Sequence, residues 1–94
     1  MRTLVWSTAF VRAFRRVIRH QPTLREKVEQ TLNRLVEDPF QSALRSHKLK
    51  GLLAGVWACS VDYNCRIIFE FVQSSTSEED DIFLLTIGSH DDVY

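Results

Sequence analysis

The stretch CRIIFEFV, residues 65–72, is apolar except at Arg66 and Glu70. Its β-branched and aromatic residues favour a β-strand. Alternate residues of a strand point to opposite faces of a sheet, and the better core face is formed by Cys65, Ile67, Phe69 and Phe71. Arg66 then lies on the opposite face, where burying its charge without a partner would be costly. Two roles remain open for Arg66: a salt bridge to Glu70 or to an acid of the C-terminal tail, and the binding of a phosphate.

Two further strand-like segments flank this stretch. Residues 56–61 come before it, across a DYN segment at residues 62–64 that is typical of a turn. Residues 82–87, IFLLTI, come after it, beyond a polar and acidic loop at residues 73–81. Three strands with such short connections predict an antiparallel meander. Gly88 is then expected to bend the chain. A tail of mostly polar residues follows: Ser89, His90, Asp91, Asp92, Val93 and Tyr94.

A strand and a helix are predicted at the start of the chain. Residues 3–6 favour a short strand, after which Ser7 or Thr8 can cap a helix. This helix should end near residues 20–21, because Pro22 disfavours helical geometry just before it. Its apolar stripe consists of Phe10, Phe14 and Val17, with Val11 and Ile18 beside them.

A second helix is predicted directly after the first. It should begin at Thr23, with Glu26 three residues later as in a capping box, and end at Asp38-Pro39. The short link between the two helices predicts an antiparallel helical hairpin. The apolar stripe of the second helix consists of Leu24, Val28, Thr31, Leu32 and Leu35.

The predicted elements follow the order β-α-α-β-β-β. This order favours an α+β fold in which a helical hairpin covers one face of a small antiparallel sheet. Residues 39–53 are expected to be irregular. Ninety-four residues leave room for one core, so residues 1–94 are expected to form a single domain.

Composition narrows the cellular setting. The longest apolar runs are far shorter than the ~20 residues of a membrane span, and arginines interrupt the N-terminal region where a signal peptide would be apolar. We therefore expect a cytoplasmic protein. Cys59 and Cys65 lack the spacing of a zinc site or a disulfide framework, and their apolar surroundings predict small buried thiols.

The net charge of zero conceals two oppositely charged halves. Residues 1–50 carry 11 basic and four acidic side chains, whereas residues 51–94 carry one basic and eight acidic side chains. A basic half suggests contact with a polyanion or with an acidic protein. A row of arginines marks the polar side of the first helix and either is simply solvated or contacts ribosomal RNA: Arg12, Arg15, Arg16 and Arg19.

Three motifs in this order carry a resemblance: LKG at residues 49–51, CRIIFE at residues 65–70 and IGSHDDVY at residues 87–94. Together with the element order and the chain length, they resemble the RelE/ParE superfamily of bacterial toxins, and within it most closely the RelE and YafQ branch. The resemblance implies a RelE-like fold over the whole chain. It also implies a growth-inhibiting mRNA endoribonuclease that works on the ribosome, uses no metal or other cofactor, and forms a hetero-oligomer with a cognate antitoxin.

The same resemblance implies which residues would act. His47 and His90 match YafQ-type histidines, Arg66 matches a RelE arginine, and Tyr94 matches the aromatic residue that closes both kinds of site. Histidine can exchange a proton near neutral pH, arginine holds a phosphate, and tyrosine stacks on bases. The neighbouring cations that are expected to bind RNA or its phosphates are Arg45, Lys48 and Lys50.

The chain also departs from these relatives. Ser60 stands where YafQ-type toxins carry a histidine, Asn64 stands where they carry an aspartate, and residues 56–61 lack the lysines of RelE. Asp91 and Asp92 replace the basic tail of RelE. These departures keep three alternatives open: a ParE-like toxin that inhibits DNA gyrase without being an enzyme, a catalytically impaired member of the family, and a domain that only binds an antitoxin.

Overall fold

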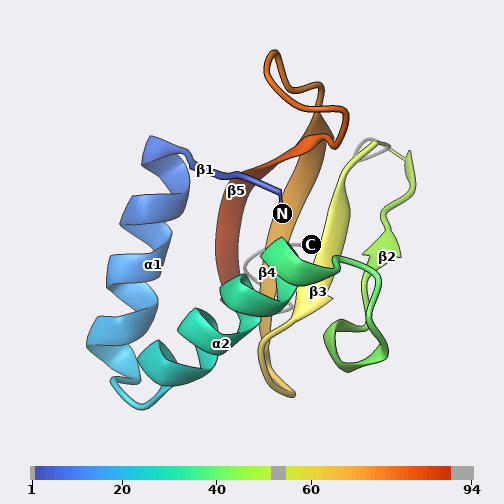
Figure 1. Ribbon diagram of the computed structural model, residues 1–94. Coiled ribbons are helices and arrows are strands. Elements are labelled where there is room, and N and C mark those ends of the chain that lie inside the picture. The colour runs from blue at the N-terminus through green and yellow to red at the C-terminus, as the bar shows by residue number, and fades with distance from the viewer. Residues whose placement is uncertain (1, 52–54, 90–94) are drawn as a thin grey trace.

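The computed structural model describes residues 2–51 and 55–89, and Figure 1 shows how their elements are arranged. A five-stranded sheet has the strand order β1-β5-β4-β3-β2. Within the described residues, no helix combines the length and the apolar character that crossing a membrane requires. In chain order, the elements are β1 (Leu4–Trp6), α1 (Thr8–His20), α2 (Leu24–Glu37), the 3-10 helix η1 (Ser42–Leu44), β2 (His47–Lys48), β3 (Trp57–Ser60), β4 (Cys65–Val72) and β5 (Asp81–Ser89).

The predicted α+β class is confirmed, and the sheet is more complex than expected. The β3-β4-β5 meander is antiparallel, as predicted. However, β1 pairs with β5 in parallel, so the sheet is mixed. Residues 39–53 are not wholly irregular, because they contain η1 and the edge strand β2. A strand of two residues is too short to show an alternating pattern, which explains why it was not predicted.

The cap of α1 was predicted correctly, and the capping box of α2 was not. The Ser7 side chain accepts a hydrogen bond from the backbone N–H of Phe10 at 3.0 Å, and α1 ends at His20. Thr23 precedes α2 in a helical conformation, and its side chain makes no capping hydrogen bond. Since a side chain caps from an extended conformation, the backbone of Thr23 rules out the capping box.

These two positions give a matched pair of stability variants. We expect Ser7→Ala to lower the free energy of unfolding by about 1 kcal/mol, because it removes a capping acceptor. Thr23→Ala should change it by less than about 0.5 kcal/mol, since no cap is lost. Urea unfolding followed by circular dichroism measures both values. Equal losses in the two variants would contradict the capping assignment.

The core lies between the two helices and one face of the sheet. The apolar stripe of α2 is buried at every predicted position, from Leu24 to Leu35, and Phe10 of α1 is fully buried. Phe69 and Ile67 of β4 are also fully buried on this face. The core face predicted for β4 is therefore confirmed, and Arg66 lies on the opposite face, which we call the helix-free face.

Gly88 does not bend the chain as expected. It is buried inside β5 and pairs with Arg66, and its φ is not positive, in contrast to Gly51 and Gly55. The strand continues to Ser89. Both neighbours of Gly88 on the strand are paired with β4. The irregularity of the sheet lies earlier, as a register shift beside Ile68 of β4.

Candidate functional site

The helix-free face brings together two of the predicted site residues. His47 of β2 pairs with Ala58 of β3, and Ala58 pairs with Ile68 of β4, so these three side chains point to the same face. Arg66 lies two residues from Ile68 on β4, so its side chain points to this face too. One strand lies between β2 and β4, so His47 and Arg66 are separated laterally by roughly 10 Å. The topology therefore places an imidazole and a guanidinium on one surface.

Arg66 is held by the turn between β3 and β4. Its Nη1 donates to the carbonyl oxygens of Asp62 at 2.7 Å, Tyr63 at 3.0 Å and Cys65 at 3.3 Å. The Asp62 carboxylate shapes the same turn by accepting from the backbone N–H of Asn64 and Cys65. Within residues 2–51 and 55–89, Arg66 forms no salt bridge with Glu70. The guanidinium is thus oriented by neutral carbonyl groups, and its charge is not cancelled there by a described carboxylate.

His47 is exposed, and it is oriented by the backbone before it. Its Nδ1 lies 3.1 Å from the carbonyl oxygen of Arg45. A carbonyl oxygen can only accept, so this hydrogen bond requires the proton on Nδ1, and in the neutral ring Nε2 then carries the lone pair. Arg45 caps η1 with a φ of 51°, in the left-handed region. This conformation turns its carbonyl towards His47.

Of the predicted RNA-binding cations, Lys48 points to the face of the sheet opposite to that of His47. Arg45, Lys48 and Lys50 are all exposed around the β2 edge of the sheet. Lys48, however, pairs with Trp57 of β3, and its Nζ lies 5.9 Å from the Trp57 ring centroid on the helix side. His47 and Lys48 are consecutive and therefore point to opposite faces.

The remaining predicted site residues, His90 and Tyr94, lie outside the described residues, as do Asp91 and Asp92. The last described residue, Ser89, pairs with Cys65, next to Arg66. Two of the departures noted in the sequence also lie near Arg66. Ser60 pairs with it directly across β3, and Asn64 belongs to the turn that holds it.

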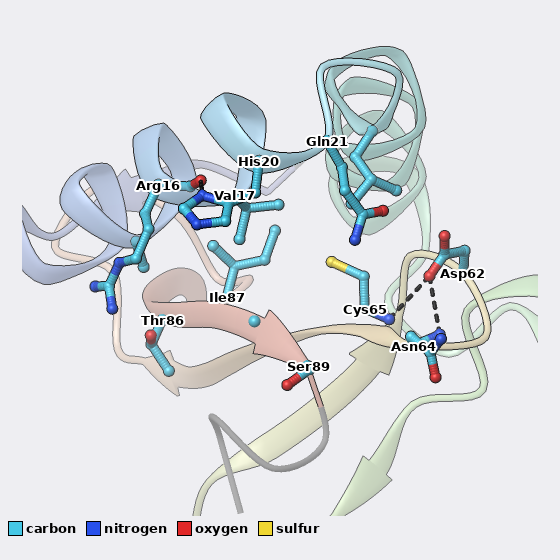
Figure 2. A pocket seen from close by; sticks show the side chains of 13 residues that line it. Arg16, Val17, His20, Gln21, Asp62, Asn64, Cys65, Thr86, Ile87 and Ser89 are labelled. Carbon is cyan, nitrogen blue, oxygen red and sulfur yellow. Dashed lines mark hydrogen bonds between the residues drawn. The ribbon is translucent and has the colours of Figure 1, made fainter.

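A cavity of about 490 Å³ lies on the helix side of the sheet. Its walls are formed by the end of α1, the β3–β4 turn and the end of β5. Figure 2 shows Arg16 and His20 of α1 on one side of it, and Asp62 and Cys65 on another. The Nδ1 of His20 bonds the carbonyl of Arg16 at 3.1 Å, as suits a histidine in a last helical turn. This cavity was not predicted, because its walls come from segments that are far apart in the sequence.

Both cysteines are buried thiols, as predicted, and neither is a nucleophile at neutral pH. Burial raises the pKa of Cys59 to about 12 and that of Cys65 to about 11. Thiolates are the reactive form of cysteine. The cavity wall at Cys65 is therefore neutral and unreactive.

The raised pKa values predict a loss of stability in alkali. In the unfolded chain the thiols ionise near their ordinary pKa of 9.0, whereas in the folded protein they ionise at about 11 and 12. The free energy of unfolding should therefore fall as the pH rises above 9, and by pH 10.5 the loss should be roughly 2 kcal/mol for each thiol, or about 4 kcal/mol in total. Urea titrations at pH 8, 9, 10 and 10.5 measure this slope. Cys65→Ala should roughly halve the loss of stability, because Cys59 remains, and an equally steep slope in that variant would contradict the prediction.

Within the described residues, no group of three or more His, Cys, Asp or Glu side chains could hold a metal ion. Solved structures of several bacterial toxins are similar to this chain. The YoeB/ParE toxin from Agrobacterium tumefaciens shares 20% identity with a TM-score of 0.75, covering 94% of this chain and 98% of that one. YafQ in the E. coli DinJ–YafQ toxin–antitoxin complex shares 13% with a TM-score of 0.74, covering 99% and 97%. A metal-bound toxin from Helicobacter pylori shares 23% with a TM-score of 0.71, covering both chains fully.

At these identities, the three structures establish the fold of the chain. The family is established by a sequence comparison: a family model described as the ParE toxin of the type II toxin–antitoxin system, parDE, matches residues 4–94. The match covers nearly the whole sequence, including both helices and all five strands. No curated protein matches the sequence closely enough to count as a relative.

Proposed function

We propose a function for this chain from one premise: it belongs to the ParE toxin family, within the RelE/ParE superfamily, and is a toxin of a type II toxin–antitoxin system. The superfamily contains both ribonucleases and inhibitors of DNA gyrase, so the premise leaves the target open. We propose that this toxin is a ribosome-dependent mRNA endoribonuclease that arrests growth in the cytoplasm.

The observation that carries the proposal is the shared face of His47 and Arg66. Arg66 is oriented by turn carbonyls, and His47 is oriented by the Arg45 carbonyl. A surface that combines an oriented imidazole with an oriented guanidinium suits phosphoryl chemistry, which needs a proton carrier and a cation for the developing negative charge.

The proposed reaction is an intramolecular transesterification of the RNA phosphate. The 2′-hydroxyl of the RNA attacks its own 3′ phosphate and loses a proton to one histidine, while the bond to the 5′ oxygen breaks and that oxygen takes a proton from the other histidine. The products are a 2′,3′-cyclic phosphate and a 5′-hydroxyl. We assign the proton transfers to His47 and His90, and the charge of the phosphorane to Arg66. Tyr94 stacks on a base, and Arg45, Lys48 and Lys50 bind the RNA backbone.

The proposed partners follow from the same assignment. YafQ forms a complex with DinJ, and we propose that this toxin likewise forms a hetero-oligomer with its own antitoxin. The exposed arginines of α1, from Arg12 to Arg19, are available for ribosomal RNA because they form no ion pair with any described residue. Contacts of this kind are electrostatic, so ribosome binding should weaken as salt is added.

A cleavage assay in a translating extract tests the proposal. The purified toxin should cut an mRNA only while it is being translated, and primer extension should map the cuts to codons within the reading frame. Purified antitoxin added in equal amount should stop the cutting. The ribonuclease assignment would be excluded if the toxin left both the mRNA intact and the translation of the extract unaffected.

A second candidate function is inhibition of DNA gyrase without catalysis. It is favoured by the side chains beside Arg66, where Ser60 and Asn64 supply neither a histidine nor a carboxylate, and by the parDE description of the matching family model. A supercoiling assay separates the candidates. Inhibition of purified gyrase, together with intact mRNA in the extract, would support the second candidate.

A further inference from the structure

Three aromatic rings gather on the helix side of the sheet, near the end of α2. The ring centroid of Phe40 lies 5.3 Å from that of Trp57 and 5.6 Å from that of Phe71, and the last two are 5.7 Å apart. We call Phe40, Trp57 and Phe71 the aromatic triangle. Trp57 and Phe71 are half-buried against the core, whereas Phe40 is 55% exposed. One ring of the triangle therefore faces solvent and is supported from behind by the other two.

Two cations lie beside the aromatic triangle. The Nζ of Lys48 is 5.9 Å from the Trp57 centroid, and the guanidinium carbon of Arg2 is 5.4 Å from the Phe71 centroid. Arg2 also contacts Glu79 at 3.9 Å, so its charge is partly compensated. Lys48 forms no ion pair within residues 2–51 and 55–89. Each of the two rings that support Phe40 thus has a positively charged neighbour.

The backbone around Phe40 is fixed by hydrogen bonds. Its N–H donates to the Asp38 carboxylate at 3.0 Å, and the Ser46 hydroxyl donates to the carbonyl of Pro39 at 2.6 Å. Pro39 itself is buried. The ring is therefore held in place before any ligand arrives, which lowers the entropy cost of stacking on it.

The triangle also continues the proposed site around one edge of the sheet. β2 is the edge strand, and its two residues point to opposite faces, His47 to the helix-free face and Lys48 towards Trp57. A single strand of RNA that passes over this edge would meet the imidazole first and the triangle next. Arg45 and Lys50 are exposed just before and after these two residues, where phosphates would pass.

We infer that the aromatic triangle is a second subsite for single-stranded RNA, in which a base stacks on Phe40 while Lys48 and Arg2 lie near the adjoining phosphates. Aromatic rings beside cations are the combination by which proteins hold unpaired bases with little sequence preference. The inference rests on the proposed function for the identity of its ligand. The subsite would add an RNA contact outside the reacting nucleotides. It lies on the face of the sheet that carries neither His47 nor Arg66.

The test measures RNA binding without cleavage. The probe is a fluorescein-labelled RNA of ten nucleotides with 2′-O-methyl groups, which lack the attacking hydroxyl, and binding to the whole toxin is followed by anisotropy in 50 mM salt. Phe40→Leu keeps an apolar side chain and removes the stacking face. We expect it to weaken binding by about 5- to 150-fold, which corresponds to the ~1–3 kcal/mol of one stacked base. Phe40→Trp should bind as tightly as the wild type.

Two matched variants make the result specific. Trp6→Leu removes another half-exposed ring, at the β1 edge, and should leave RNA binding unchanged. Lys48→Gln should reduce the slope of log affinity against log salt by about one, since one phosphate contact is lost. Thermal unfolding of each variant excludes misfolding as the cause.

The outcomes separate this inference from the proposed function. Weaker RNA binding by Phe40→Leu, with Trp6→Leu unaffected, supports the subsite even if the toxin cuts no mRNA. Wild-type binding by Phe40→Leu overturns the subsite even if mRNA cleavage is observed. The subsite is also overturned if the wild type does not bind the probe. It is overturned as well if Phe40→Leu loses antitoxin binding with RNA binding unchanged, a result that would identify a protein-docking surface.

Discussion

Replacing His90 with alanine is expected to lower the rate of mRNA cleavage by about 10²- to 10⁴-fold, the range that general acid–base catalysis contributes. Growth arrest on expression should disappear with it. The reason is the position of the residue in the chain, directly after Ser89, which pairs with Cys65 beside Arg66. Toxicity is measured as colony formation after induction, and cleavage as the mapped cuts in a translating extract.

His20→Ala is the matched control for this variant. His20 is an exposed histidine whose ring bonds the Arg16 carbonyl on α1, and it is not part of the helix-free face. We expect His20→Ala to stay toxic and His90→Ala to keep its affinity for the antitoxin. If His90→Ala remained fully toxic, the assignment of His90 as an acid or base would be wrong.

Phe69→Ala is expected to cost about 3–5 kcal/mol of the free energy of unfolding, the range for removing a large aromatic side chain from a core. Phe69 is fully buried on the central strand β4 and packs edge-on against Phe71, with centroids 5.6 Å apart. The total free energy of unfolding of a native protein is about 5–15 kcal/mol. Toxicity should therefore be lost through unfolding rather than through chemistry.

Urea unfolding of Phe69→Ala and Phe69→Leu measures this effect. Phe69→Leu keeps most of the apolar volume and should cost less than about 1.5 kcal/mol. Val72→Ala, at an exposed position of the same strand, should change little. A midpoint of Phe69→Ala close to that of the wild type would contradict the assignment of Phe69 to the core.

The parts of the fold that were predicted correctly are those with a strong local pattern. The alternation in residues 65–72 located β4 and its two faces, and the stripe from Leu24 to Leu35 located α2. The patterns that failed depend on distant partners. Gly88 remains extended because it pairs with Arg66 inside the sheet, and β2 exists because it adds to the edge of β3. Neither partnership is visible in a window of a few residues.

The candidate site was predictable only in part for a similar reason. The shared face of His47 and Arg66 follows from the register of three strands, which the sequence does not specify. The turn carbonyls that hold Arg66 were not foreseen, because the sequence suggested either a carboxylate or a phosphate as its partner. The cavity beside α1 was missed altogether, since Arg16, Asp62 and Ser89 meet there only in the folded chain.

The parallel pairing of β1 with β5 sets the order in which the chain can fold. β1 has β5 as its sheet neighbour, and Leu4 pairs with Ile82, 78 positions further along. Closing so long a loop is slow compared with forming the β3–β4 hairpin. We therefore expect β1 to join the sheet only after β5 has formed. A nascent chain that has not yet been extended through residues 81–89 lacks both the strand that leads to His90 and the sheet partner of residues 4–6, so the candidate site cannot assemble until β5 has been synthesised.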